Sequence, residues 1–363
     1  MARLGISIYV GHFPIERDIE YVKKAASSGF SRIFMDLLAV GEKTQEEVIT
    51  EYRQITDLAA DLNMEVILDV APNIFQQFNL SYDDLSFFKA MNVAGIRLDV
   101  AFSAGQVSQM TFNKEGLKIE LNSSMGDGTI DDIMSHYPNP ETLITCHNFY
   151  PQRYTGLSVE HFNLCNEIVR RNNLPVAAFV SSQNKDTFGP WPVNEGLCTL
   201  EMHRDLPIDV QMRHLIATQG VDDIIIANAY ASDEELETCA KIHPGILTFK
   251  IDFEKELQET ERKIVYEHYH HVRGDMSSYM ARSTMPRVTY ADLSVTPENT
   301  RDLKRGDVVV VNDNYSRYKG EIHIVLEDMP NDGRKNVIGR IPENEHVLME
   351  FIKPWRPFAF LQD

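Results

Sequence analysis

A strand-then-helix pattern recurs along most of this chain and limits what it can fold into. Short apolar runs such as SRIFMDLL, EVILDVAPN and GIRLDVAF alternate with longer segments whose apolar residues recur at helical spacing. Counted from ARLGISIYVG, about eight units of roughly 30 residues fill the first two thirds of the chain, as a (β/α)8 barrel requires. A doubly wound sheet is the alternative, but the turn VGHFPIERD lacks the phosphate-binding signature GxGxxG. The sequence therefore predicts an α/β fold built on a (β/α)8 TIM barrel.

The pattern changes near residue 250. The segment EKELQETERKIVYEHYHH is charged and is predicted to be a helical connector. Strand-like runs follow it, including RGDVVVVND, GEIHIVLED and HVLMEFIKPWRPFAFL, with Gly and Asp between them. We predict a catalytic barrel over residues 1–250, and a connector helix with a small β-rich domain, either a barrel or a sandwich, over 251–363.

Composition excludes several classes of function. The net charge of −19 argues against a nucleic-acid partner, because neutralising a phosphate backbone needs a basic surface. No apolar run is long enough to cross a membrane, and the start MARLGISIYV lacks the features of a signal peptide. The four cysteines are scattered without CxxC spacing, which is typical of reduced thiols. We expect a cytoplasmic protein that acts on a small molecule.

Three aspartates stand near the ends of consecutive predicted strands: Asp36, Asp69 and Asp99. Strand ends in such a barrel meet at one mouth, so neighbouring carboxyls can drive each other's pKa values apart. One acid then keeps its proton while another stays ionised, which is what glycoside hydrolysis requires. Asp99 and Asp69 are our first choices for the catalytic pair, with Asp36 in a binding role. Which acid donates the proton, and whether the enzyme retains or inverts, stays open.

Other polar residues are predicted to surround this mouth and contact a substrate. Arg97 shares a strand face with Asp99 and is expected to orient that carboxylate or to bind an anionic group. Further candidates at strand ends are Asn73, Asn122, His147 and Asn148. A core histidine satisfied by backbone groups is the alternative for His147.

The long insertion GPWPVNEGLCTLEMHR precedes the last barrel unit and is predicted to be a lid or specificity loop. Trp191 offers an apolar face for a sugar ring, and His203 is a candidate ligand contact. Glu201 is the main competitor for a catalytic role. An ordinary surface loop with a core tryptophan is the alternative.

A local cationic pocket is needed if the substrate is an anion. The segment HVRGDMSSYMARSTMPR brings arginines beside hydroxyls, and we predict phosphate binding by Arg282, Ser283 and Arg287. A domain interface with salt bridges is the alternative. HExxH does not occur, and the HxH spacing of His268 and His270 falls in the charged connector rather than at a strand end, so no metal site and no cofactor are expected.

Several motifs together resemble the bacterial 6-phospho-N-acetylmuramidases, glycoside hydrolase family 170. They are LGISIYVGHFP, FMDLL, LDVAPN, RLDVAF, CHNFYP, GPWPVNEGLCTLEMHR and ARSTMPR, in this order over essentially the whole chain. The resemblance implies a TIM barrel joined to a cyclophilin-like β domain. It also implies a cytoplasmic enzyme of peptidoglycan recycling that cleaves the β-1,4 bond of a phosphorylated amino-sugar disaccharide, 6-phospho-N-acetylmuramyl-N-acetylglucosamine.

Two other functions remain open from the residues alone. One is a non-catalytic sugar-phosphate binding or regulatory protein on a barrel scaffold, although three carboxylates at the mouth do not suit an anionic ligand. The other is a metal-dependent lyase or isomerase. The oligomeric state is open as well, a homodimer included.

Overall fold

The computed structural model of the protein describes residues 2–38, 40–98, 102–193 and 195–362. Asp99, one of the two first choices for catalysis, lies outside the described residues. The chain divides into two compact units, residues 1–242 and 243–363. This boundary lies before the predicted one at residue 250. Strand β9 (Leu247–Phe249) belongs to the second unit, because it pairs with a strand of that unit.

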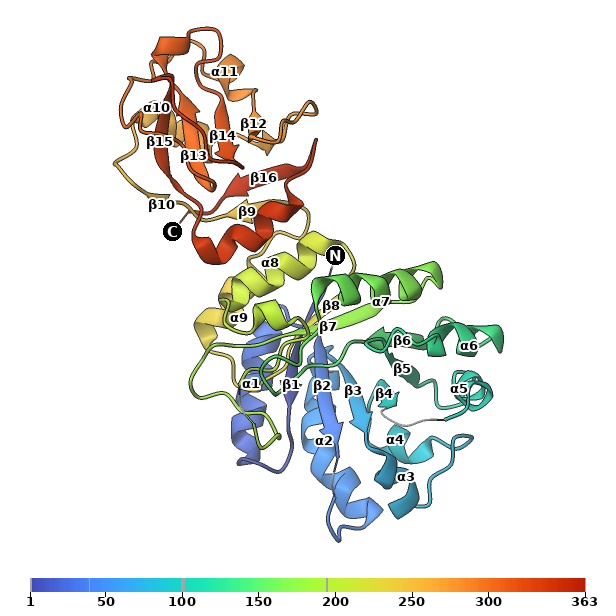
Figure 1. Ribbon diagram of the computed structural model, residues 1–363. Helices are drawn as coiled ribbons and strands as arrows, with labels where there is room; N and C mark the ends of the chain where they lie inside the picture. Colours follow the sequence, from blue (N-terminus) through green and yellow to red (C-terminus); the bar gives the residue numbers. More distant parts are fainter. Residues whose placement is uncertain (1, 39, 99–101, 194, 363) are drawn as a thin grey trace. The chain divides into compact units, whose positions relative to one another are not determined.

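Eight parallel strands close into a barrel in the first unit (Figure 1). Each strand pairs with the next along the chain, and the eighth pairs with the first, so the barrel has no free edge. The strands are β1 (Arg3–Ile8), β2 (Arg32–Leu37), β3 (Glu65–Val70), β4 (Gly95–Leu98), β5 (Lys118–Asn122), β6 (Leu143–Cys146), β7 (Val176–Val180) and β8 (Asp223–Ile226). The predicted (β/α)8 barrel is confirmed.

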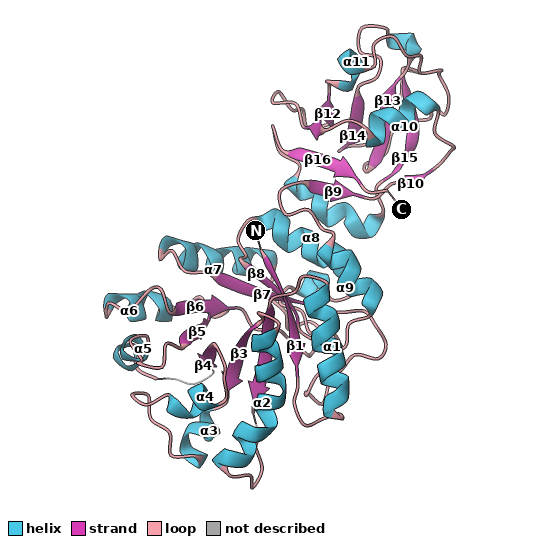
Figure 2. Ribbon diagram, turned by 180° about the vertical axis from the view of Figure 1, so that it is seen from behind, coloured by secondary structure: helices cyan, strands magenta, loops and turns pink. Residues whose placement is uncertain are grey.

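Helices alternate with these strands and lie around the outside of the barrel (Figure 2). They are α1 (Ile15–Ser27), α2 (Gln45–Asp61), α3 (Pro72–Gln77), α4 (Ser86–Ala90), α5 (Ala104–Met110), α6 (Thr129–Ser135), α7 (Val159–Arg171), α8 (Ile208–Thr218) and α9 (Asp233–Ala240). Thr44, Ser103 and Ser232 each open a helix with a reciprocal capping box. These caps fix where the chain leaves the loop that follows a strand and enters the next helix.

The barrel interior holds buried charges as well as apolar side chains. Arg32, at the start of β2, donates to Glu120 of β5 and to Asp223 of β8. These strands are not neighbours in the sheet, so the three side chains meet across the interior. Arg3 also donates to Asp223, with 2.7 Å between Nε and Oδ1. A buried guanidinium between two carboxylates thus fills one end of the barrel.

The second unit contains two sheets. One has the order β10-β15-β13-β14-β12, and the other has the order β11-β16-β9. The strands after β9 are β10 (Asp252–Phe253), β11 (His270–His271), β12 (Met280–Ser283), β13 (Asp307–Val311), β14 (Ile322–Val325), β15 (Lys335–Arg340) and β16 (Pro357–Phe360). The unit also contains α10 (Glu259–Tyr266), α11 (Pro286–Thr289) and the 3-10 helices η2 (Asp313–Tyr315) and η3 (Glu343–Phe351). In the described part of the barrel unit, η1 (Glu201–His203) is a 3-10 helix as well.

The final run HVLMEFIKPWRPFAFL, predicted as strand, is strand only in its second half. Its first half lies in η3, where Glu345, Leu348 and Met349 are buried at helical spacing. The Glu345 carboxylate also accepts the backbone N–H of Lys250, at 2.8 Å. A buried contact made by one helical face therefore outweighs the β propensity of this apolar run.

The buried charges predict a test of barrel stability. Replacing Arg32 by Met leaves Glu120 and Asp223 without their shared cation, which should destabilise the barrel by about 3–5 kcal/mol. The measurement is the urea midpoint of the barrel's unfolding transition, followed by circular dichroism. Arg53→Met, which breaks the exposed pair with Asp57, is the control and should leave the midpoint almost unchanged. Equal midpoints for both variants would contradict a structural role for the interior charges.

Candidate active site

Two acids face each other across neighbouring strands at the C-terminal end of the barrel. Asp36 of β2 and Asp69 of β3 are paired in the sheet register. Neighbouring strands lie about 4.8 Å apart and paired residues point to the same side, so the two side chains are adjacent. Both residues are only 8% exposed. The sheet itself therefore places two carboxyls side by side in a nearly dry position.

The two acids differ in their surroundings. Burial, and then the negative charge of Asp69, raise the pKa of Asp36 to about 7. Asp69 instead accepts a hydrogen bond from Arg97, with 2.7 Å between Nη1 and Oδ1. This guanidinium favours the ionised form of Asp69. One carboxyl thus holds a proton near neutral pH, while its neighbour carries a compensated negative charge.

Arg97 also fixes the far side of the mouth. It comes from β4 and is buried, and its Nη2 donates to Oδ1 of Asn148, which follows β6. The Asn148 backbone is fixed as well, because its N–H donates to Ser124 Oγ at 2.8 Å and its carbonyl accepts from Thr199 Oγ1 at 2.9 Å. A bridge from Asp69 through Arg97 to Asn148 therefore spans the barrel end.

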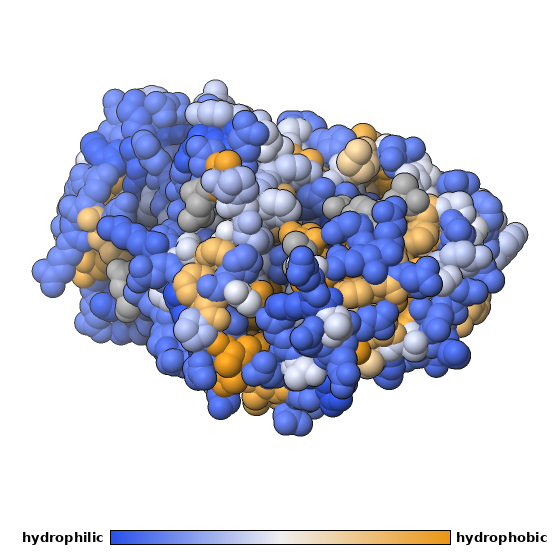
Figure 3. Space-filling view, turned by 90° about the horizontal axis from the view of Figure 1, so that it is seen from below, coloured by the Kyte–Doolittle hydropathy of each residue, from blue (hydrophilic) through white to orange (hydrophobic). Residues whose placement is uncertain are grey.

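A pocket of about 220 Å³ opens over this bridge. Its lining is Phe34, Leu38, Asp69, Arg97, Asn148, Phe149, Pro151, Phe179 and Trp191. Four of these nine residues are aromatic, and the centroids of Phe149 and Trp191 lie 6.3 Å apart. Figure 3 looks onto this end of the barrel and shows hydrophobic side chains set in a largely hydrophilic face. An apolar wall with few convergent polar groups suits a sugar ring.

The loop that carries Trp191 is held by a buried arginine. Arg204 donates to both carboxylate oxygens of Glu201, at 2.7 and 2.6 Å, and to the backbone carbonyls of Tyr150, Glu195 and Gly196. Trp191 itself is 39% exposed. The insertion therefore has a fixed base, and its tryptophan reaches the pocket.

Both units of the chain match models of one protein family. Residues 4–241 match the family model described as 6-phospho-N-acetylmuramidase, N-terminal, and residues 247–361 match its C-terminal counterpart. The chain belongs to the 6-phospho-N-acetylmuramidase family. The predicted resemblance is thereby confirmed, and the fold is that of a glycoside hydrolase family.

Two solved structures resemble this muramidase-family chain over its whole length. An uncharacterized protein from B. cereus is 44% identical, with a TM-score of 0.92 and 100% of both chains covered. A conserved protein of unknown function from Enterococcus faecalis is 24% identical, with a TM-score of 0.75; the match covers 100% of this chain and 97% of that one, and shows the fold alone. A search of curated proteins finds no match.

The structure corrects the prediction that His147 contacts a ligand. His147 is fully buried, and its ring nitrogens lie 2.9 Å from Asn166 Oδ1 and 3.3 Å from Ser124 Oγ. Burial lowers the pKa of His147 to about 4. Asn166 belongs to α7, so the ring points outward toward the helix layer and forms part of the core.

His203 is likewise a core residue in this muramidase-family barrel. It is fully buried, with 3.0 Å between its Nε2 and Nδ1 of His214. Burial lowers the pKa of His203 well below its usual range. Its predicted role as a substrate contact is therefore corrected to a neutral histidine that packs the loop base against α8.

Glu201 is placed as a loop anchor, and this corrects its candidacy as a catalytic acid. Besides Arg204, its oxygens accept the backbone N–H groups of Tyr154 and Gly156, both at 2.8 Å. The bond with Arg204 comes first among the causes that lower the pKa of Glu201 to about 2. A carboxylate with four donors and so low a pKa neither donates a proton nor presents a free oxygen for attack.

The remaining predicted contacts are more scattered. Asn73 is exposed on α3, and its Nδ2 lies 3.5 Å from the Leu38 carbonyl. Asn122 accepts the Ser124 N–H at 2.8 Å and stabilises a turn. Neither lines the pocket.

Three aromatic residues of the pocket were not predicted from the sequence: Phe34, Phe149 and Phe179. Phe34 lies two positions before Asp36 on the same strand face, and this spacing is a signal that could have found it.

The predicted phosphate residues belong to the second unit. Arg287 donates to the buried Glu321 at 2.6 Å, so its charge is already compensated. Ser283 Oγ lies 3.0 Å from Nδ1 of His270. Arg282 lies 3.5 Å from Asp275 and is partly exposed. Among these three, Arg282 has the weakest internal partner.

Two features are absent from the parts of the chain that the structure describes. No cluster of three or more His, Cys, Asp or Glu side chains within them could hold a metal ion. No helix there combines the length and apolar character needed to cross a membrane.

The anchoring role of Glu201 can be tested by proteolysis. Glu201→Gln weakens the charge-assisted bonds to Arg204 and should make the loop around Trp191 several-fold more sensitive to limited digestion. Cleavage sites and rates would be followed by mass spectrometry. Glu234→Gln, on the exposed first turn of α9, is the matched control and should be cut like the parent protein. An unchanged rate in Glu201→Gln would remove Glu201 as an anchor.

Proposed function

We propose that this protein hydrolyses the β-1,4 bond between 6-phospho-N-acetylmuramic acid and N-acetylglucosamine. The family match supports the substrate class. The chemistry is supported by one observation above the others: adjacent carboxyls, one with a pKa near 7 and one paired with Arg97. We further propose that the reaction takes place in the cytoplasm during peptidoglycan recycling.

Asp36 is the proposed general acid. Its raised pKa, about 7, lets Asp36 keep a proton near neutral pH, and this proton can pass to the O4 oxygen of the leaving N-acetylglucosamine as the bond from O4 to C1 breaks. Protonation avoids expelling an alkoxide. The proton held by Asp36 thus becomes the hydroxyl hydrogen of the released sugar.

Asp69 is the proposed partner of the muramyl C1 atom. Its negative charge can stabilise the developing oxocarbenium ion, and it then either bonds to C1 or takes a proton from the attacking water. Arg97 holds the carboxylate in place through the 2.7 Å hydrogen bond. Asp99 stays a prediction for either catalytic role.

The pocket wall supplies binding and orientation. Phe149 and Trp191 present ring faces and edges against which the apolar side of a pyranose can pack. Asn148, held by Arg97 and Thr199, adds an amide for the hydroxyl or acetamido groups of the sugar. We propose a phosphorylated amino-sugar disaccharide as the partner of this site, with no nucleic acid and no membrane; a homodimer stays a prediction.

The deciding experiment is incubation with the 6-phosphorylated muramyl disaccharide and with its unphosphorylated form. Proton NMR would identify the products and the anomer first released. We expect cleavage of the phosphorylated compound only. Binding without cleavage would instead support a regulatory protein, and activity that is lost on chelation would support a metal-dependent enzyme.

Two substitutions should separate the roles of the acids. Asp36→Asn should lower kcat on the disaccharide by about 10²–10⁴-fold, and much less on an aryl glycoside whose phenolate leaves without protonation. Asp69→Asn should lower turnover of both substrates, because the aryl group does not replace a nucleophile or base. Asp131→Asn, which weakens a surface pair with Arg171 and a hydrogen bond from Asn172, is the control. Equal losses on both substrates in Asp36→Asn would exclude Asp36 as the acid.

The raised pKa of Asp36 predicts the pH dependence. Only the protonated form acts as a general acid, so kcat/KM should fall about tenfold per pH unit above roughly pH 7, where that proton is lost. This fall in kcat/KM at high pH should be absent with the aryl glycoside. A profile for the disaccharide that stays flat from pH 6 to about 9 would contradict the assignment.

A further inference from the structure

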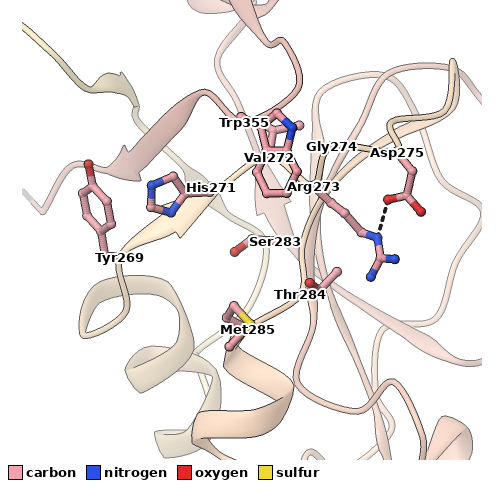
Figure 4. A pocket seen from close by; sticks show the side chains of 10 residues that line it. All are labelled: Tyr269, His271, Val272, Arg273, Gly274, Asp275, Ser283, Thr284, Met285 and Trp355. Atoms are coloured by element: carbon pink, nitrogen blue, oxygen red, sulfur yellow. Dashed lines mark hydrogen bonds and ion pairs between the residues drawn. The ribbon is translucent and has the colours of Figure 1, made fainter.

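A second cavity lies wholly within the C-terminal unit. It has a volume of about 730 Å³ and is formed by the chain around β11, the turn after it, the end of β12 and the segment before β16 (Figure 4). Its lining is Tyr269, His271, Val272, Arg273, Gly274, Asp275, Ser283, Thr284, Met285 and Trp355. Aromatic rings, hydroxyls and a guanidinium thus share one hollow.

Trp355 is held in this cavity by an unusual backbone arrangement. Its side chain is 74% exposed, and its φ of 67° lies in the left-handed region that bulky residues rarely adopt. The indole packs on Gly274, where an added Cβ would lie 2.4 Å from Trp355 Cε2. The backbone N–H of Trp355 also donates to the Val272 carbonyl at 2.9 Å. A strained backbone conformation at a residue whose large ring stays exposed is typical of a binding surface.

Positive charge stands beside this ring. Arg273 and Arg282 share a single acid of the lining, Asp275: Arg273, which also lines the cavity, hydrogen-bonds it through Nε, and Arg282, which stands outside the lining, lies 3.5 Å from it. Two guanidinium groups on one carboxylate leave one positive charge in a chain whose net charge is −19. Asp275 itself is exposed, so an incoming anion can take its place on the arginines. The Thr284 hydroxyl adds a further hydrogen-bonding group to the lining.

We propose that the C-terminal unit holds an acidic-sugar site of its own. The sugar ring packs on Trp355, and a phosphate or carboxylate group of the ligand binds Arg273 and Arg282. Arg287, predicted from the sequence to bind phosphate, is not part of this site because its guanidinium already binds Glu321. The choice of an acidic amino sugar as ligand rests on the proposed function, whereas the ring platform and the shared acid are features of the unit itself.

The chain contains two tryptophans, one in each cavity, and this permits a site-specific measurement. In full-length Trp191→Phe, Trp355 is the sole indole reporter; in full-length Trp355→Phe, Trp191 is. Each variant would be titrated with N-acetylglucosamine 6-phosphate, N-acetylmuramic acid, neutral N-acetylglucosamine and inorganic phosphate. The first two arms distinguish a phosphate from a carboxylate as the recognised group.

We expect a saturable change in Trp355 fluorescence with one or both acidic sugars, at least tenfold weaker binding of the neutral sugar, and weaker binding of inorganic phosphate. Arg273→Met and Arg282→Met, each made in Trp191→Phe, should lower the affinity about tenfold. Arg334→Met is the matched control, since that partly exposed arginine of the same unit packs on Tyr315 and pairs with Asp332 rather than with Asp275 of the cavity. Calorimetric titration of the same variants measures binding independently of the indole signal.

Three outcomes would overturn the proposal: no binding that depends on Arg273 or Arg282 by either method, equal affinity for acidic and neutral sugars, or inorganic phosphate binding as tightly as the sugars. Hydrolysis of the disaccharide is measured separately. If hydrolysis fails while arginine-dependent binding persists, the proposed function falls and the site stands. If hydrolysis occurs and neither method detects binding at the cavity, the proposed site falls and the proposed function stands.

Discussion

The hydrogen-bonded ion pair between Arg97 and Asp69 sets the charge state of the barrel mouth. A buried guanidinium needs an anion beside it, and a buried carboxylate needs a cation. Arg97 and Asp69 therefore compensate each other's charge. The charge that Asp69 then carries acts on Asp36, one strand away, and adds to the burial that raises the pKa of Asp36. The difference between the two acids therefore follows from burial, which favours the protonated form of Asp36, and from the position of Arg97, which favours the ionised form of Asp69.

This pair lies at the C-terminal end of the barrel and ends a longer series of alternating charges that runs through the barrel interior. The side chains, in order from the opposite end, are Arg3, Asp223, Arg32, Glu120, Arg97 and Asp69. Glu120 is fully buried and is influenced by both Arg32 and Arg97. Removing one member would leave its neighbours uncompensated in a medium where charge interactions are strong. Interior stability and the chemistry of the mouth are thus coupled through shared carboxylates.

Strand parity explains which site residues could be predicted from the sequence. Asp36, Asp69 and Arg97 were found because the period of two in a strand, together with parallel pairing, fixes both their direction and their level. The same rule separates His147 from Asn148: adjacent residues point to opposite sides, so only Asn148 faces the mouth. The roles of Glu201 and His203 could not be found this way, because they depend on loop partners distant in sequence, such as Gly156 and His214. The barrel followed from periodicity, whereas η3 did not, because its buried contacts with the rest of the second unit overrode local propensity.

The balance of charge at the mouth also limits what the barrel pocket can recognise. Among the described residues that line it, Arg97 alone is cationic, and Asp69 already compensates that charge. A phosphate or lactyl carboxylate brought into this lining would add negative charge beside Asp69 and would hold the proton on Asp36 more tightly, weakening it as an acid. A substrate that carries two anions is therefore served best when they are met by cations outside the lining of this pocket. The bond proposed to be cleaved is then left among the aromatic rings and beside Asp69 of the lining, and the difference in protonation between Asp69 and Asp36, its neighbour on β2, is preserved.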